Sequence, residues 1–441
     1  MSERRRRIVI TVITGACLAI VVYATQPKPS DAVHRATVLP DRIILSWTQD
    51  PATTQAVTWR TDTSVSRSFA QIAVAEDGPK FEQHASQVSA TVVPIISDLG
   101  KYHYHSAEFT GLVPKTTYAY RLGDGENWSA WNNFRTASTE DEPFSFLYFG
   151  DAQKRIHSHW SRLLRTAYSA APHARFFMHA GDLIDRQGRD SDWGEWHEAA
   201  GWVNAVTPSL AVPGNHEYEH GIGRTTKQLS VFWQPQFQFP QNGPPGLEDT
   251  TYWLDYQGVR FIVLNSNERI EEQTVWLQKV LADNPHKWTI VMHHHPLYSV
   301  SVNSDNNAHL RKAWQPLYDK YGVDLVLQGH DHCYGRTSLR GYKDKSSGAG
   351  TVVSAGTVYV VSVSGPKMRR VGKLGFSSSA EGIQLFQVIT IDHDYLKYES
   401  RTAVGRLHDA FTLRKREGQT NELIEDFAPG ERTAAEPANF E

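Results

Sequence analysis

Metal-capable side chains follow five apolar runs in the second half of the chain, each where the run ends. The runs cover residues 144–150, 174–181, 209–214, 287–293 and 323–329. The side chains that follow them are Asp151, Asp182, Asn215 with His216, His294 with His295, and His330 with His332. Because open α/β sheets place their sites outside the carboxyl ends of the strands, we expect these groups to meet at one edge of a sheet. Carboxylate oxygens combined with imidazole nitrogens favour iron, manganese or zinc as the bound metal.

Each of these residues has a simpler interpretation when it is taken alone. An aspartate after a strand usually caps a turn or a helix. A lone histidine more often packs or faces solvent than binds a metal ion. Five such strand ends in succession favour a common site, because clustered carboxylates and imidazoles are typical of metal centres. The sequence therefore predicts one metal centre rather than five separate turns.

Three consecutive histidines, residues 293–295, leave the ligand at the fourth strand end to be decided. Successive side chains of a strand point to opposite faces, so Met292 and His294 share one face and His293 takes the other. The alternation predicts that His294 is the ligand and that His293 packs elsewhere.

Two regions of different pattern must position these residues. Residues 41–137 contain about seven short alternating runs rich in Thr, Tyr, Trp and Val, separated by turn residues, which predicts a β-sandwich. No cluster of carboxylates or histidines stands out there, so we expect a structural or docking domain. Over residues 142–403, near-continuous apolar runs alternate with stretches of helical periodicity, such as residues 158–171 and 271–284. This alternation predicts an α/β domain.

The two ends of the chain have their own patterns. Residues 1–24 join four arginines to an apolar run of seventeen residues, which is typical of an export signal. A run of that length also stands at the short limit of a membrane span, so a cleaved signal peptide and an uncleaved anchor both remain open. We expect a linker over residues 25–40 and an exported chain that is periplasmic, secreted or held outside the cytoplasm by a membrane anchor. Residues 404–441 are expected to hold a further strand and, from about Glu417, a solvated acidic tail.

The overall composition narrows the classes of partner. The chain is 40% hydrophobic and 11% aromatic, as globular proteins are. Its net charge of -3 provides no basic field, so we expect no nucleic-acid binding. Of the two cysteines, Cys17 lies in the export segment and leaves Cys333 without an intrachain partner. Stability must therefore come from packed cores and bound metal.

Short motifs around the strand ends carry a resemblance to a known family. They are Gly150-Asp151, Gly181-Asp182-Leu183, Gly214-Asn215-His216-Glu217, Val291-Met292-His293-His294 and Gly329-His330-Asp331-His332. In this combination the chain resembles the calcineurin-like metallophosphoesterases, and within them the purple acid phosphatases. Residues 42–62 are similar to the opening strands of the fibronectin type III-like domain of that branch. The resemblance implies an all-β sandwich followed by a metallophosphoesterase domain made of two mixed sheets flanked by helices.

The resemblance also implies a role for each residue. Asp182 would bridge two metal ions, Asp151 and His332 would complete the first position, and the second would be completed by Asn215, His294 and His330. His216, together with Asn215, would contact the phosphate, and His216 would protonate the leaving oxygen. The alternative for His216 is a residue that only orients a ligand. His295 and His309 are further candidates for contact with the phosphate.

Two positions depart from the pattern of purple acid phosphatases. Asp185 stands where that branch has the tyrosine that binds ferric iron, so no purple charge-transfer band is expected. Gln153 replaces the histidine of an Asp-x-His motif and could ligate through its carbonyl oxygen or only donate a hydrogen bond. Both departures leave the identity of the metal open.

As a whole, the resemblance implies a metal-dependent phosphoric ester hydrolase with Asp182 and His216 in catalytic roles. We expect an acid-phosphatase-like phosphomonoesterase that uses two metal ions and a metal-bound hydroxide. One alternative is a phosphodiesterase on the same site. The other is a non-catalytic surface protein that binds carbohydrate or mediates adhesion through residues 41–137. The complete set of ligands argues against this last alternative.

Overall fold

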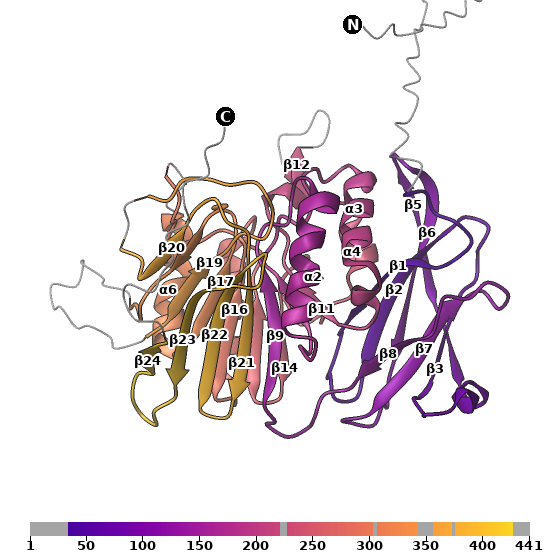
Figure 1. Cartoon of the computed structure of the whole chain (residues 1–441), viewed down its shortest axis with the longest axis horizontal. Helices are drawn as coiled ribbons and strands as arrows, with labels where there is room; N and C mark the ends of the chain where they lie inside the picture. Colours follow the sequence, from indigo (N-terminus) through magenta and orange to yellow (C-terminus); the bar gives the residue numbers. More distant parts are fainter. Residues whose placement is uncertain (1–33, 221–226, 303–306, 342–355, 373–374, 427–441) are drawn as a thin grey trace, which may run out of the picture.

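The computed structural model describes residues 34–220, 227–302, 307–341, 356–372 and 375–426. The predicted export segment and most of the predicted linker lie outside these residues, as does the end of the predicted tail. Within the described ranges, no helix combines the length and the apolar character needed to cross a membrane. Two domains lie side by side in Figure 1, the first in indigo and purple and the second in magenta to yellow.

The first domain is a sandwich of two four-stranded antiparallel sheets, ordered β1-β2-β6-β5 and β4-β3-β7-β8. Its elements are β1 (Asp41–Ser46), β2 (Gln55–Asp62), β3 (Phe69–Val74), η1 (Pro79–His84), β4 (Ser86–Ser89), β5 (Thr91–Ser97), β6 (Gly100–Phe109), β7 (Thr117–Gly123) and β8 (Asn132–Arg135). Inward-facing residues such as Trp59, Phe109 and Tyr120 form its core. The edge strands β4 and β5 are mostly exposed, and Pro94 in β5 is tolerated because an edge strand can do without one amide donor.

The second domain contains two seven-stranded mixed sheets, as the resemblance implied. The first sheet, ordered β11-β10-β9-β21-β22-β23-β24, consists of β9 (Phe144–Phe149), β10 (Phe177–His179), β11 (Ser209–Ala211), β21 (Leu385–Asp392), β22 (Tyr395–Thr402), β23 (Leu407–Arg414) and β24 (Glu422–Glu425). The second, ordered β14-β15-β16-β17-β19-β18-β20, consists of β14 (Tyr252–Tyr256), β15 (Val259–Val263), β16 (Trp288–Met292), β17 (Leu325–Gln328), β18 (Tyr334–Arg336), β19 (Val358–Val361) and β20 (Ser378–Ala380). One apolar core containing Phe146, Ile389, Phe261 and Ile290 joins the two sheets.

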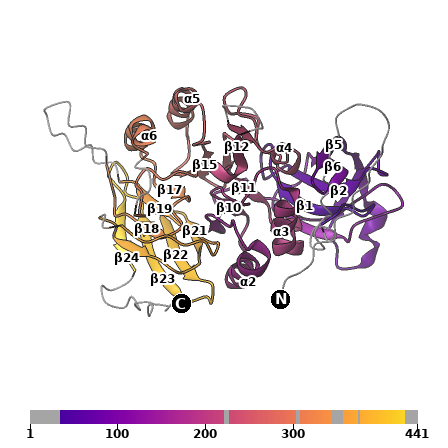
Figure 2. The same cartoon turned by 90° about the horizontal axis from the view of Figure 1, so that it is seen from above.

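Helices cover the outer faces of this pair of sheets. In Figure 2, α5 (Ile270–Ala282) and α6 (Ala308–Tyr321) lie on the opposite side of the sheets from α2 (Ser161–Ala170). A second core unites Leu277 of α5 and Trp314 of α6 with Val291 and Val326 of the sheet beneath. The remaining short elements are η2 (Ile156–Trp160), α3 (Asp190–Ala200), η3 (Gly201–Ala205), η4 (Asn215–Glu217), the β12 (Tyr218–His220) and β13 (Lys227–Leu229) hairpin, and α4 (Trp233–Gln236).

Parallel pairing sets the position of the site. Strands β9, β10 and β11 run parallel to one another in the first sheet. Strands β15, β16, β17 and β19 do the same in the second sheet. Parallel strands bring their carboxyl ends to a common edge, where the loops that follow can share one site. All the residues proposed as ligands lie in such loops.

A buried ion cluster joins the two domains. Asp190, at the start of α3, pairs with Arg42 of β1 and lies 3.6 Å from Arg60 of β2. Arg60 also pairs with Asp41 at 2.6 Å. The side chains of Arg42, Arg60 and Asp190 are at most 3% exposed, so the ion pairs are shielded from water. We call these four residues the interdomain cluster, and it fixes the sandwich against the second domain.

The structure corrects the expectation of a solvated tail from about Glu417. Residues 422–425 form β24, which pairs with β23 along its whole length. Glu425 of β24 accepts hydrogen bonds from the buried Arg336 of β18, which also binds Asp409 of β23. The partner that orders this acidic segment is therefore an arginine almost ninety residues earlier, which periodicity within the tail does not reveal.

Candidate metal centre

The candidate ligands lie on sharply turned backbone. Asp151, Asp182, His330 and His332 all have positive φ angles, between 42° and 74°. Such conformations cost non-glycine residues on the order of 1–3 kcal/mol each and persist where the surrounding structure imposes them, often at functional sites. The loop of Gly329 closes tightly on this site, since a Cβ atom there would lie 2.5 Å from Asp151 Oδ2.

The first group of ligand atoms comes from Asp151, Asp182 and His332, and these atoms lie within 4.8 Å of one another. One carboxylate oxygen of Asp151 accepts a hydrogen bond from the backbone amide of His330 at 2.7 Å. The other, Oδ1, is buried without a hydrogen-bond partner among the described residues and lies 3.8 Å from His332 Nε2. His332 Nδ1 donates its proton to the Lys367 carbonyl at 3.1 Å. The other ring nitrogen, Nε2, is therefore unprotonated, and its lone pair faces the carboxylate of Asp151. Two acceptors facing each other fit a shared cation.

The second group forms around His294. Its Nδ1 donates to the Ala180 carbonyl at 2.8 Å, which directs Nε2 toward the site. That Nε2 lies 3.2 Å from Asn215 Oδ1 and 3.3 Å from Asp182 Oδ1. His330 Nδ1 lies 2.8 Å from the same Asn215 oxygen. Asp182 therefore contacts both groups and stands between them.

Burial and charge act together on these groups. Burial raises the pKa of Asp151 well above its ordinary value. Although burial also opposes ionisation of Asp182, the neighbouring His294 holds the pKa of Asp182 well below its ordinary value. Burial would lower the pKa of His294, yet Asp182 and Asp151 raise it to about 9. The two buried carboxylates thus share the positive charge of one imidazole, that of His294. Bound cations would supply the positive charge that is still missing from the site.

His216 is oriented by the residue that replaces the family tyrosine. The backbone amide of His216 donates to Asp182 Oδ1 at 2.9 Å, and its Nδ1 donates to the carbonyl of Asp185 at 2.6 Å. The other nitrogen, Nε2, then lies 3.9 Å from Asp182 Oδ2 on a side chain that is 24% exposed. The Asp185 carboxylate lies 3.6 Å from His216 Nδ1 and 3.8 Å from Lys154 Nζ. Asp185 therefore positions His216.

Gln153 is hydrogen-bonded at both ends of its amide. Its Nε2 donates to Asp182 Oδ2 at 2.5 Å, and its Oε1 accepts from Lys367 Nζ at 3.2 Å. Both ends of the amide are thus occupied by protein groups in this structure. Lys367 was not predicted as a site residue. It follows the apolar run of residues 357–365, whose strand β19 ends at the same edge as β17, so the strand-end argument could have found it.

Glu217 is a second residue whose role the sequence analysis did not assign, although it belongs to a quoted motif. Its carboxylate accepts from the backbone amides of Asp182, Leu183, Ile184 and Gly214 at 2.7 to 3.2 Å. Burial and the charge of Asp182 raise the pKa of Glu217 to about 7. Glu217 ties the Asp182 loop to the Asn215 loop.

The other histidines named in the sequence analysis lie at different distances from the candidate ligands. His293 points away from the ligands and packs against Trp314, with ring centroids 5.0 Å apart. His295 lies beside His330 at 4.6 Å between ring centroids, and its Nδ1 is hydrogen-bonded to Ser266 Oγ. His309 is exposed in the first turn of α6 and belongs to neither group of ligand atoms found among the described residues.

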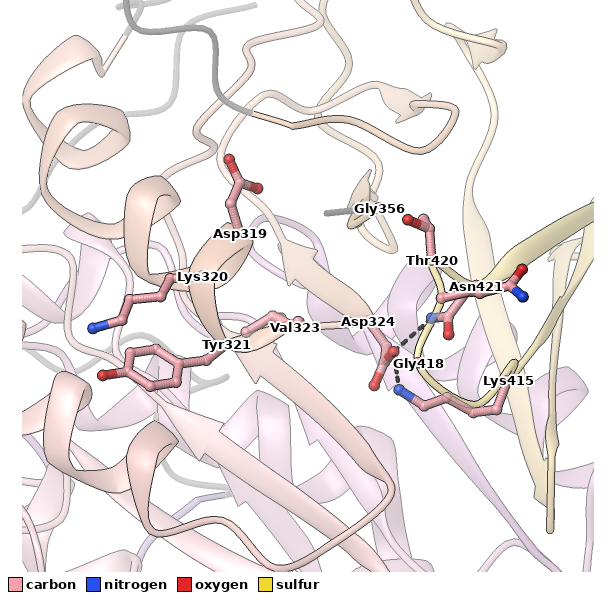
Figure 3. A pocket seen from close by; sticks show the side chains of 12 residues that line it. Asp319, Lys320, Tyr321, Val323, Asp324, Gly356, Lys415, Gly418, Thr420 and Asn421 are labelled. Atoms are coloured by element: carbon pink, nitrogen blue, oxygen red, sulfur yellow. Dashed lines mark hydrogen bonds and ion pairs between the residues drawn. The ribbon is translucent and has the colours of Figure 1, made fainter. Parts of the chain in front are cut away.

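A cavity of about 400 Å³ lies at the opposite, amino end of β17. Figure 3 shows Asp324 in its lining, with hydrogen bonds from Lys415 Nζ at 2.5 Å and Asn421 Nδ2 at 2.6 Å. Asp324 thus has a lysine as its ion-pair partner, whereas Asp151 Oδ1 has no hydrogen-bond partner among the described residues. This cavity is separate from the candidate metal centre and shares none of its residues.

Comparisons with known proteins identify both domains. Residues 40–136 match the family model of the purple acid phosphatase N-terminal domain, and residues 144–334 match that of the calcineurin-like phosphoesterases. Acid phosphatase type 7 of Danio rerio is 26% identical over 407 residues, which cover 81% of this chain and 88% of that relative. An uncharacterized protein of Mycobacterium tuberculosis is 29% identical over 277 residues, which cover 53% of this chain and 51% of that relative. The match thus spans about half the length of the mycobacterial relative.

Solved structures agree at the level of the fold. A purple acid phosphatase from yellow lupin (Lupinus luteus) seeds has a TM-score of 0.72 at 21% identity, over 86% of this chain and 75% of that chain. The structure of PhoD has a TM-score of 0.63 at 12% identity, over 89% of this chain and 93% of that chain. The two family models match in this order along the chain, so it combines the N-terminal domain of the purple acid phosphatases with a calcineurin-like phosphoesterase domain.

Proposed function

We propose that the chain is a metal-dependent phosphomonoesterase that works with two metal ions. The observation that carries the proposal is the position of Asp182 between a fully buried group of ligand atoms and a partly buried one. A single carboxylate shared in this way is how a protein holds two ions close enough to act on one phosphoryl group. Relatives that carry the name acid phosphatase support the choice of phosphate monoesters.

The donor set fits two cations. Asp151, Asp182 and His332 would hold one ion, and the second would be held by Asp182, Asn215, His294 and His330. The buried Oδ1 of Asp151, which has no partner among the described residues, gives the first position an oxygen ready for metal. The mixed oxygen and nitrogen ligands suit iron, manganese or zinc. When bound, the ions would lower the pKa of a water molecule and offset the charge of the phosphoryl group.

The surrounding residues prepare the site for hydrolysis. His216 presents Nε2 on the open side of Asp182, where it can bind a phosphoryl oxygen and protonate the leaving oxygen. Its Nδ1 hydrogen bond to Asp185 fixes the ring and keeps Nε2 directed inward. His295, with Nδ1 tied to Ser266, presents its other edge beside His330 and is the second candidate for phosphate contact.

An assay of reconstituted protein tests the proposal. The purified chain is stripped of metal, supplied with iron, manganese or zinc, and assayed on an aryl phosphate and on a bis-aryl phosphate diester. We expect metal-dependent turnover that is faster on the monoester. Faster turnover of the diester would favour a phosphodiesterase on the same site, and no turnover of either ester with any of the three metals would contradict the proposal.

A further inference from the structure

A basic segment runs beside the candidate metal centre. We call residues 365–372 the basic strap; it follows β19 and contains Lys367, Arg369 and Arg370 with no acidic residue. Because β19 runs parallel to β17, the strap leaves the sheet at the same edge as His330 and His332. The strap is therefore placed by the same topology that places the candidate ligands.

Hydrogen bonds to three loops fix the path of the strap. The amide of Gly365 donates to the Asp151 carbonyl at 2.7 Å, and a Cβ atom on Gly365 would lie 2.6 to 2.8 Å from three carbonyl oxygens of residues 151–153. The Arg369 amide donates to the His332 carbonyl at 3.0 Å, while His332 Nδ1 donates to the Lys367 carbonyl at 3.1 Å. Farther along, the Val302 amide donates to the Arg370 carbonyl at 2.9 Å. The backbone of Lys367 and Arg369 is thus locked to a candidate ligand.

Lys367 and Arg369 have no ion-pair partner among the described residues. Lys367 is half-buried and donates to Gln153, and Arg369 is exposed. Neither forms an ion pair with a carboxylate of the described residues. Both residues nevertheless stand at the site, because Lys367 donates to Gln153, which in turn donates to Asp182, and the Arg369 amide binds the carbonyl of His332. Arg370, one residue farther on, is bound through its carbonyl to the amide of Val302 rather than to a candidate ligand.

Charge balance indicates what these cations bind. The two metal ions and His216 suffice to neutralise one phosphoryl group in the proposed function. A guanidinium and an ammonium held in addition, without protein carboxylates, match a second phosphate group, because arginine binds phosphate through paired hydrogen bonds. We propose that Lys367 and Arg369 form an anion subsite for a second phosphate group of the substrate. This inference rests on the proposed function, since it concerns substrates of the same site.

Matched substrate pairs test the subsite. The metal-loaded wild type and Arg369→Gln are assayed on AMP and ADP, where the second phosphate is joined by an anhydride. They are also assayed on fructose 6-phosphate and fructose 1,6-bisphosphate, where it is joined by a separate ester. We expect Arg369→Gln to lower the ratio of kcat/KM for the two-phosphate substrate over the one-phosphate substrate about tenfold in at least one pair. The pair that responds identifies the linkage.

Arg370→Gln is the matched control, because it removes the same charge from the same strap and should leave both ratios unchanged. Lys367→Gln is the second variant and should lower the same ratio as Arg369→Gln. Metal content is measured in every variant, and Arg369 is exposed, so folding and metal loading should survive its replacement. Equal losses on one- and two-phosphate substrates, or an equal response of Arg370→Gln, would overturn the subsite. Absence of turnover by the loaded wild type would instead overturn the proposed function.

Discussion

The molecule contains two buried ionic clusters that are built on opposite principles. In the interdomain cluster, Arg42 and Arg60 surround Asp190, and Arg60 also holds Asp41. In the candidate metal centre, the ligands include two aspartates but no arginine or lysine, and Asp151 Oδ1 faces the unprotonated Nε2 of His332 at 3.8 Å. The charges of the first cluster are balanced within the protein, whereas those of the second would be balanced by the proposed cations. Internal charge balance therefore separates a buried cluster that holds the fold together from one that binds a ligand.

The largest expected effect comes from Asp182→Asn. Removing the shared negative charge should release both ions and lower kcat/KM by at least about a thousandfold, because the ions supply several kcal/mol of transition-state stabilisation. Metal analysis of the purified variant, together with turnover of an aryl phosphate, checks the prediction. Retention of both ions at wild-type stoichiometry would show that Asp182 is not the bridge.

Asp190→Ala should affect the other cluster in the opposite way. It leaves Arg42 buried without its ion-pair partner, while Arg60 keeps Asp41, and the loss of one partner of a buried pair typically costs about 3–5 kcal/mol of unfolding free energy. Metal content should stay at the wild-type level. Chemical denaturation measures the loss of stability. Asp41→Asn is the milder control and should cost less, because its carboxylate is 38% exposed and Arg60 would keep Asp190 at 3.6 Å. Equal costs in both variants would contradict the argument from burial.

His216→Ala should separate catalysis from metal binding within the candidate site. Because Nε2 of His216 lies beside Asp182 and outside both groups of ligand atoms, both ions should remain bound. The loss of a proton donor should lower kcat by about a hundredfold. Steady-state kinetics with metal analysis checks this, and loss of metal equal to that of Asp182→Asn would make His216 a ligand instead.

A smaller effect concerns pH. Burial lowers the pKa of His179, the last residue of strand β10, to about 3. The unfolded chain takes up this proton below about pH 6.5, so the contribution of neutral His179 is complete above that pH and is lost progressively as pH falls toward 3. At pH 5 the loss is about 2 kcal/mol. His179→Phe keeps the contact with Phe149 and removes the titrating group. The drop in unfolding free energy between about pH 7.5 and pH 5 should therefore be smaller in this variant by that amount. An unchanged slope in denaturation series between pH 7.5 and 5 would contradict it.

Sequence patterns predicted the elements that carry strong periodicity. The two-domain organisation, the α/β alternation and the meeting of Asp151, Asp182 and His330 all follow from strand ends and parallel pairing. The separation of His294 from His293 agrees with strand alternation. These features depend on local pattern, which a single sequence displays.

The missed features depend on contacts between distant segments. The strand β24 is ordered by Arg336, and the interdomain cluster joins Asp190 to arginines more than a hundred residues earlier. Lys367 reaches the site because β19 lies next to β17, an adjacency that depends on sheet order. His309 is exposed in the first turn of α6, and its contact with phosphate stays a prediction, since position in the sequence does not fix the direction of a side chain.

The most direct measurement of the central claim is anomalous X-ray diffraction from crystals of metal-loaded protein. The account predicts two anomalous peaks per chain, both in contact with the carboxylate of Asp182, one beside Asp151 and His332 and the other beside Asn215, His294 and His330. A single peak, or peaks that do not share Asp182, would contradict it.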